Sequence, residues 1–228
     1  MPALNFSLSP FPSRIDLLRE HTRTAHDAIE AMPGMRRLMA TDYTINEYEA
    51  LLLRLLGYIE PLERMLNYAP KAHFQLGCSR TACLYADLAE IGAKPLANAQ
   101  RAGFSALDFA DESVRAGICY VLEGSALGGQ VIRRALNQNL GTRVANAINY
   151  FDCYHGKHGK VWRSTLSQIE QTPNLDATRM VGAAAEIFGS LHAWLGANRE
   201  AHPAEVLSGL KQTGAKCPFA RFSNWIGL

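Results

Sequence analysis

The stretch Tyr120-Val121-Leu122-Glu123-Gly124-Ser125-Ala126-Leu127-Gly128-Gly129-Gln130-Val131-Ile132 combines a helical pattern of apolar residues with three glycines. A glycine inside a helix costs about 1 kcal/mol relative to alanine, so three cost about 3 kcal/mol, a large part of a typical net stability. Gly124 and Gly128 are four residues apart and therefore share one helix face. A face without side chains lets the helix backbone approach another object closely, or lets the helix bend.

Three interpretations of this glycine-rich segment compete. It could mark a close helix–helix crossing of the small-xxx-small kind, which is mainly a membrane device. It could be a loop, although both flanks have a helical pattern, or it could be a helix that lies over a planar cofactor. The spacing alone favours the first two interpretations over the third. A phosphate-binding loop is excluded, because no lysine follows the glycines and no strand precedes them.

An amphipathic helix is expected near the start of the chain. Ser13 is a suitable N-cap and Asp16 stands at the reciprocal position of a capping box, so a helix should run from there to about Ala31, before Pro33-Gly34. Because an α-helix turns by about 100° per residue, one stripe of this helix is mostly apolar and consists of Ile15, Leu18, Thr22, Ala25 and Ile29.

His26 lies about 20° from Ile15, at the edge of this stripe, and it has two interpretations. It could be a histidine at the edge of the core that binds a carbonyl group, because imidazole is often partly buried. It could instead be a heme ligand, since neutral imidazole binds iron. Glu30, one turn later, could then accept a hydrogen bond from the other ring nitrogen. Arg19, about 10 Å earlier along the axis, could meet a carboxylate at the porphyrin rim. These residues alone leave the two interpretations balanced.

The rest of the chain has the pattern of a single all-α domain. Further helices are predicted over residues 44–68, 79–91, 112–137, 139–150, 159–171 and 177–198, with a short one after Pro203. No segment alternates as a strand would. We therefore expect a flexible arm over residues 1–12, a helical domain over residues 13–213 and an irregular tail over residues 214–228.

The composition limits the kinds of function. Of 228 residues, 48% are hydrophobic and 19% are charged, as in ordinary globular proteins. The formal net charge of +2 is too small to indicate a nucleic-acid partner. No apolar run approaches the roughly 18 residues of a membrane span, and the first residues lack the pattern of a secretory signal. The five cysteines show no metal or disulfide spacing, so we expect reduced thiols in a cytoplasmic protein.

Four segments, in order along the chain, resemble the heme oxygenase family. Residues 18–26 have its L-R-x-x-T-x-x-x-H opening, and residues 122–130 resemble its distal-helix signature. The stretch from Tyr150-Phe151-x-x-Tyr154 to Trp162-Arg163 and residues 183–195 resemble two later helices of the family. The form E-G-S-x-L-G-G is closest to heme oxygenases found beside bacterial phytochromes. Together the four segments span about residues 15–196.

The resemblance implies the all-α heme oxygenase fold, with heme between the first helix and the glycine-rich helix. On one side of the heme, His26 would be the proximal iron ligand. Arg19 and Arg163 match basic positions that contact the heme propionates in this family.

On the other side of the heme, the distal backbone of the family corresponds to Gly124, Gly128 and Gly129. Many members carry an aspartate where Ser125 stands, whereas the phytochrome-associated members commonly have serine. With waters beside it, Ser125 is the candidate for a mild proton relay, and it forms the expected catalytic segment with Gly124 and Gly128.

The implied reaction is oxidative cleavage of heme to biliverdin, carbon monoxide and ferrous iron, with heme as both substrate and cofactor. It uses O2 and electrons from an external donor such as a ferredoxin, a flavodoxin or an NAD(P)H-dependent reductase. The biliverdin could be delivered to a phytochrome. Arg133, Arg134, Lys157 and Lys160 could dock an acidic donor, although ordinary solvated charge explains them equally well.

Two histidine motifs and one cysteine motif have simpler explanations. Asp152-x-x-His155 and His155-x-x-His158 have helical metal spacing, but a di-iron bundle needs two Glu-x-x-His motifs. We interpret them as a solvated surface cluster near Lys157 and Lys160, and we also expect His21 at the surface. Cys217-Pro218 resembles a heme-regulatory dipeptide, but it stands in the irregular tail, where such a pair usually has no role.

Two other functions are compatible with the same helical pattern. The first is a non-catalytic heme-binding protein for storage, transfer or sensing, which would keep His26 and the glycine-rich helix. The second is a relative that uses no heme, such as a non-heme metal oxygenase or a thiamin-salvage type of hydrolase.

Overall fold

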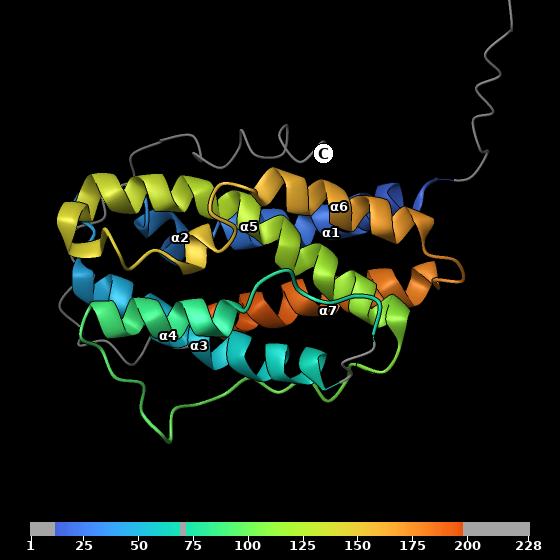
Figure 1. The fold of residues 1–228 in the computed structure, drawn as a ribbon, viewed down its shortest axis with the longest axis horizontal. Coiled ribbons are helices and arrows are strands. Elements are labelled where there is room, and N and C mark those ends of the chain that lie inside the picture. Colours follow the sequence, from blue (N-terminus) through green and yellow to red (C-terminus); the bar gives the residue numbers. More distant parts are fainter. Residues whose placement is uncertain (1–11, 69–71, 198–228) are drawn as a thin grey trace, which may run out of the picture.

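The computed structural model describes residues 12–68 and 72–197, and these residues form α-helices and short 3-10 turns without any strand (Figure 1). The elements are α1 (Arg14–Glu30), α2 (Pro33–Arg37), α3 (Ile45–Asn67), α4 (Arg80–Glu90), α5 (Glu112–Leu140), η1 (Gly141–Val144), η2 (Tyr150–Asp152), α6 (His158–Gln171) and α7 (Ala177–Gly196). The all-α fold is confirmed. Among the described residues, no helix is long and apolar enough to span a membrane.

Several sequence predictions lie outside the described residues. These are all but the last residue of the N-terminal arm, the helix after Pro203, the tail from residue 214 and the pair Cys217-Pro218.

Capping side chains set the starts of the helices. Ser13 and Asp16 form the predicted capping box at the start of α1, and Thr44 with Glu47 forms a second box at the start of α3. Asp111 caps α5 by accepting from two backbone N–H groups. Each cap satisfies N–H groups that have no partner inside their own helix, which is why these boundaries could be read from the sequence.

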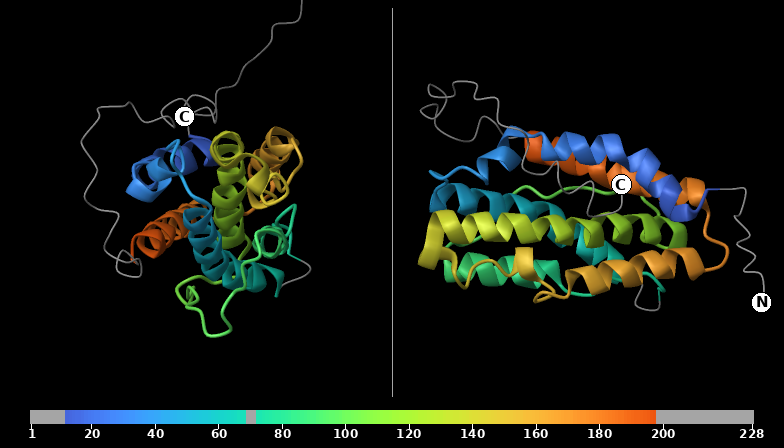
Figure 2. Two further views of the ribbon diagram at one scale, coloured as in Figure 1. Left: turned by 90° about the vertical axis from the view of Figure 1, so that its left-hand side faces the viewer. Right: turned by 90° about the horizontal axis from the view of Figure 1, so that it is seen from above.

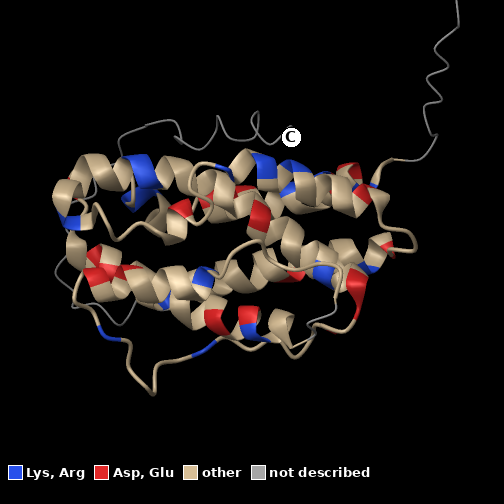
Figure 3. Ribbon diagram, in the orientation of Figure 1, with Lys and Arg blue, Asp and Glu red and all other residues tan. Residues whose placement is uncertain are grey.

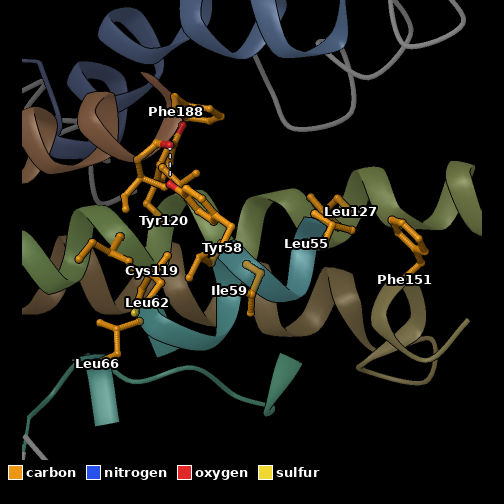
Figure 4. Close-up of a cluster of buried hydrophobic side chains, with 14 of the residues drawn as sticks. Leu55, Tyr58, Ile59, Leu62, Leu66, Cys119, Tyr120, Leu127, Phe151 and Phe188 are labelled. Atoms are coloured by element: carbon orange, nitrogen blue, oxygen red, sulfur yellow. Dashed lines mark hydrogen bonds between the residues drawn. The ribbon is translucent and has the colours of Figure 1, made fainter. Parts of the chain in front are cut away.

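The helix α5 is the centre of the bundle. It packs against α6 and α7, α1 packs against the same two helices, and α3 packs against α4. Figure 2 shows α1 and α7 side by side. In the core drawn in Figure 4, Leu55, Tyr58 and Ile59 of α3 are buried together with Leu127 of α5 and Phe151 of η2.

A close helix–helix crossing does exist, but it lies at Gly117 and not at Gly124 or Gly128. A Cβ atom on Gly117 would stand 2.1 Å from the backbone oxygen of Met180 and 3.1 Å from the backbone nitrogen of Ala184. The backbones of α5 and α7 therefore touch at this point, and only glycine permits the contact.

We expect Gly117→Ala to lower the free energy of unfolding by about 3 kcal/mol, because the added methyl group overlaps a backbone atom that cannot rotate away. Gly189→Ala on α7 is the matched control. Its Cβ would meet no atom within 4 Å, so the gain in helix propensity should raise stability by about 1 kcal/mol. Urea denaturation of both variants checks this, and equal stability of the two would contradict the crossing.

The helix predicted over residues 139–150 is wrong. Instead, α5 continues to Leu140 and ends at Gly141, whose φ of 57° is in the left-handed region. Two 3-10 turns follow, and at the start of the second the buried carboxylate of Asp87 accepts hydrogen bonds from the backbone nitrogens of Asn149 and Tyr150. The short helix α2 was not predicted either. Pro33-Gly34 was interpreted only as the end of the preceding helix, whereas Pro33 also begins α2, at a position where proline is well tolerated.

Candidate functional site

One apolar cleft is bounded by α1, α3, α5 and α7. Its wall includes Thr22, His26 and Glu30 from α1, Leu55 from α3 and Phe188 from α7, together with the glycine-rich segment of α5. The cleft holds about 1370 Å³ of empty space, which includes solvent at its mouth. Small-molecule sites are concave and mostly apolar, and the lining of this cleft has that character.

His26 is positioned on the α1 side of the cleft. Its side chain is 26% exposed, and its ring makes an edge contact with Phe188, with 5.8 Å between ring centroids. Nδ1 lies 3.7 Å from Oε1 of Glu30 and 3.9 Å from Oδ1 of Asp27. A proton on Nδ1 therefore faces carboxylates, and the lone pair of Nε2 is left for a metal ion. Burial lowers the pKa of His26, which favours the neutral ring that ligates metals.

Glu30 lines the same cleft one turn after His26. Burial and the nearby charge of Asp27 raise the pKa of Glu30 to about 7. His26, Asp27 and Glu30 bring their possible metal-ligand atoms within 4.8 Å of one another, and no other group of three histidine, cysteine or carboxylate side chains among the described residues does so. A heme iron bound by His26 and a divalent cation held by all three residues are therefore the two chemistries that this corner of the cleft offers.

The glycine-rich segment forms the opposite wall as a continuous part of α5, so the loop interpretation is wrong. A Cβ atom on Gly128 would meet nothing within 4 Å, and one on Gly124 would meet the Trp162 ring at 3.4 Å. Gly129 faces the backbone of Phe151, since its Cβ would lie 3.0 Å from that carbonyl oxygen. All three glycines line the cleft, and at Gly128 the missing side chain leaves open space.

Ser125 is exposed on this wall, between Gly124 and Gly128. Its hydroxyl group donates a hydrogen bond of 2.7 Å to the carbonyl oxygen of Leu122 in the preceding turn of α5. The oxygen of Ser125 keeps its lone pairs available to accept a hydrogen bond from a water or ligand in the cleft.

Arg19 and Arg163 do not line the cleft. Arg19 lies on α1 one turn before Thr22 and makes a 3.8 Å ion pair with Asp16. Arg163 is exposed on α6. The remaining sequence-predicted site residues, namely His26, Glu30, Gly124, Ser125, Gly128 and Gly129, all lie on the cleft wall.

Sequence reasoning missed a buried polar network that reaches the cleft wall at Arg80. The guanidinium group of Arg80 donates to the carbonyl oxygen of Leu122 at 2.7 Å and to a carboxylate oxygen of Glu123 at 2.9 Å. The hydroxyl group of Tyr154 donates to the same carboxylate at 2.6 Å. A charged residue inside the apolar α5 signals a buried partner, but the sequence does not say which cation, 43 positions away, supplies it.

The expected surface cluster of histidines is wrong for His158. This residue is 4% exposed, lies 3.2 Å from the side-chain nitrogen of Gln130 and 3.8 Å from Asp152, and contacts the Tyr154 ring edge-on. His155 has a φ of 47° in the turn before α6. After this turn α6 packs against α5, and His158 is buried there. His155 itself is exposed, and so is His21 on α1.

These observations define a class of all-helical protein with a histidine on one wall of an apolar cleft and a glycine-rich helix on the other. The family model described as heme oxygenase matches residues 14–197, and the chain belongs to the heme oxygenase family.

The chain is also 35% identical over 94 residues to a curated protein named "Heme oxygenase" from Xanthomonas campestris pv. campestris (strain 8004). The aligned stretch covers 40% of this chain and 54% of that protein, so the chain spans about half the length of this relative. No solved structure matches the chain.

Proposed function

We propose that this protein degrades heme, cleaving it oxidatively to biliverdin, carbon monoxide and ferrous iron with O2 and electrons from an external donor. The observation that carries the proposal is that His26 and the side-chain-free face of α5 line the same apolar cleft. Membership of the heme oxygenase family supports the same reaction.

The residues of the cleft fit a heme group. Apolar side chains suit the faces of the macrocycle, and the lowered pKa of His26 keeps a neutral ring for iron. The open space at Gly128 gives room for a flat ligand where any side chain would intrude. Arg19, one turn along α1 from the cleft wall, and Arg163 are the proposed partners of the propionates, which they would reach by extending over the rim.

Heme, when bound, supplies redox-active iron and is itself the molecule that is cleaved. His26 would hold the iron through Nε2, since its Nδ1 faces the carboxylates of Glu30 and Asp27 at 3.7 and 3.9 Å. The backbone at Gly124 and Gly128 limits the height of the space on the other side. Ser125 holds a water there through its hydroxyl oxygen and passes protons through that water, while the apolar walls exclude bulk solvent.

Three finer features belong to the same proposal. The E-G-S-x-L-G-G form supports a place among the phytochrome-associated heme oxygenases, with delivery of biliverdin to a phytochrome. A ferredoxin, flavodoxin or NAD(P)H-dependent reductase would supply electrons. Its docking surface would use Arg134, Lys157 and Lys160, which are exposed on α5 and at the start of α6. Figure 3 shows where basic and acidic residues lie along the helices. Arg133 is less available, because its Nε lies 3.5 Å from Asp152.

We expect Ser125→Ala to slow heme turnover about tenfold and to leave hemin affinity unchanged within about twofold, because only the proton relay loses a group. Single-turnover absorbance measurements and hemin titrations separate the two quantities. A variant that turns heme over at the rate of the unaltered protein would exclude Ser125 from the relay.

Hemin titrations with and without prior addition of a divalent cation test which ligand the cleft binds. We expect one hemin per chain, and we expect prior addition of Zn²⁺ or Fe²⁺ to leave hemin affinity unchanged. Tight binding of the cation at His26, Asp27 and Glu30, with no uptake of hemin, would favour the non-heme alternative and overturn the proposal.

A further inference from the structure

Three cysteines that are far apart in the sequence gather beside α5. Cys153 is buried in a small cluster with Ala126 and Tyr154, and both Cys78 and Cys83 pack against that cluster. Cys78 precedes α4, Cys83 lies in its first turn, and Cys153 follows η2. The fourth described cysteine, Cys119, is buried in the main core instead.

A buried cation faces two of these thiols. Arg80 is 1% exposed and interacts electrostatically with the sulfur atoms of Cys78 and Cys153. One terminal nitrogen of Arg80 donates to Leu122 and Glu123. The Nε atom is buried and has no hydrogen-bond partner among the described residues. A guanidinium group with a buried donor to spare stabilises an anion at its side, and a thiolate is the anion that this cluster can form.

The two thiols beside Arg80 differ in acidity. A hydrogen bond from the Cys153 thiol and the charge of Arg80 together lower the pKa of Cys78 to about 7. The same hydrogen bond and burial raise the pKa of Cys153, which keeps its proton. Burial raises the pKa of Cys83 to about 11. Cys78 is also half-buried, whereas Cys153 is only 7% exposed, so Cys78 is the thiol that a small oxidant reaches first and Cys153 is the neighbour that can react next.

We propose that Cys78 and Cys153 form a peroxide-sensitive thiol pair that closes into a disulfide. The Cys78 thiolate attacks one oxygen of hydrogen peroxide, the O–O bond breaks, and sulfenic acid and hydroxide form. Cys153 then attacks the sulfenic sulfur, its proton leaves with the displaced hydroxyl group as water, and an S–S bond forms. In sum, two thiols are oxidised and one hydrogen peroxide is reduced to two waters.

A metal site is the other chemistry that clustered thiols provide. Among the described residues, however, no three cysteine, histidine or carboxylate groups near Cys78 bring their ligand atoms within 4.8 Å of one another. The arrangement is that of a reacting pair rather than a closed ligand set.

The test uses the full-length protein without heme, so that its outcome is independent of the proposed function. Cys217→Ser removes the one cysteine outside the described residues. After reduction and treatment with hydrogen peroxide, we expect peptide mass spectrometry to find the Cys78–Cys153 disulfide. In the Cys153→Ser variant, we expect one sulfenic acid per chain at Cys78, trapped by dimedone. Cys83→Ser is the matched control and should leave disulfide formation unchanged.

Alkylation rates give a second readout that needs no variant at the pair. At pH 7, Cys78 should be thiolate to a much larger extent than Cys83, because Arg80 lowers the pKa of Cys78 whereas burial raises that of Cys83. Iodoacetamide should therefore label Cys78 at least about tenfold faster than Cys83, even after allowance for the lower nucleophilicity of the more acidic thiol. Peroxide treatment that leaves Cys78 and Cys153 as thiols, or equal labelling rates of Cys78 and Cys83, would overturn the proposal.

Discussion

In the His26→Ala variant, we expect the hemin spectrum of an imidazole-bound iron to disappear, hemin affinity to fall more than about 100-fold and heme turnover to stop. Loss of groups that merely support a metal ligand typically costs 10- to 100-fold in affinity, so loss of the ligand should cost more. The fold should survive, because the His26 side chain is 26% exposed and its main contact in the core is the edge of Phe188.

His21→Ala is the matched control for this prediction. His21 lies on the same helix, is exposed, and its Nδ1 is 2.8 Å from the carbonyl oxygen of Leu17 rather than in the cleft. Its removal should leave the hemin spectrum and the affinity unchanged. An unaltered spectrum in His26→Ala would point to another iron ligand.

Gly128→Leu should have opposite effects on stability and on binding. The free energy of unfolding of the heme-free protein should rise by about 1 kcal/mol, because leucine is a better helix former and the Cβ of residue 128 meets nothing within 4 Å. Hemin affinity should fall about 10- to 100-fold, since the new side chain fills the space proposed for the porphyrin, and overpacking typically costs 1–3 kcal/mol. Gly128→Ala should give the same gain in stability with a smaller loss of affinity.

Gly182→Ala controls for helix propensity alone. Gly182 is exposed on α7, outside the cleft, and its Cβ would also meet nothing within 4 Å. It should gain about the same stability as Gly128→Ala and bind hemin normally. Denaturation curves and hemin titrations of the three variants check the prediction. A Gly128→Leu protein that binds hemin as tightly as the unaltered chain would show that this face of α5 does not contact the ligand.

Local signals in the sequence were enough to predict most of the helices. The capping box at Ser13 and the apolar periodicity of α3 and α5 depend on residues a few positions apart, and these helices begin and end within three residues of their predicted bounds. The failure at residues 139–150 has a different origin. There, the carboxylate of Asp87, about 60 positions earlier, binds the backbone of Asn149 at the start of the second turn, a contact that no local pattern indicates.

In the candidate site, too, local features could be predicted from the sequence and long-range contacts could not. The face shared by Gly124 and Gly128 and the position of His26 on α1 follow from helical periodicity, so the sequence could place them on facing walls once the resemblance was known. The partner of Glu123 could not be found, because Arg80 reaches it only through the packing of α4 against the core. The thiols of Cys78 and Cys153 are 75 positions apart, and no spacing in the sequence indicates that they lie together.

Exposure of the hemin-loaded protein to a reductant in air tests the central claim most directly. We expect the heme absorption to decay, biliverdin to appear and one carbon monoxide and one ferrous iron to be released per heme. A heme that stays intact through repeated reduction in air would identify a carrier instead and would contradict the proposed reaction.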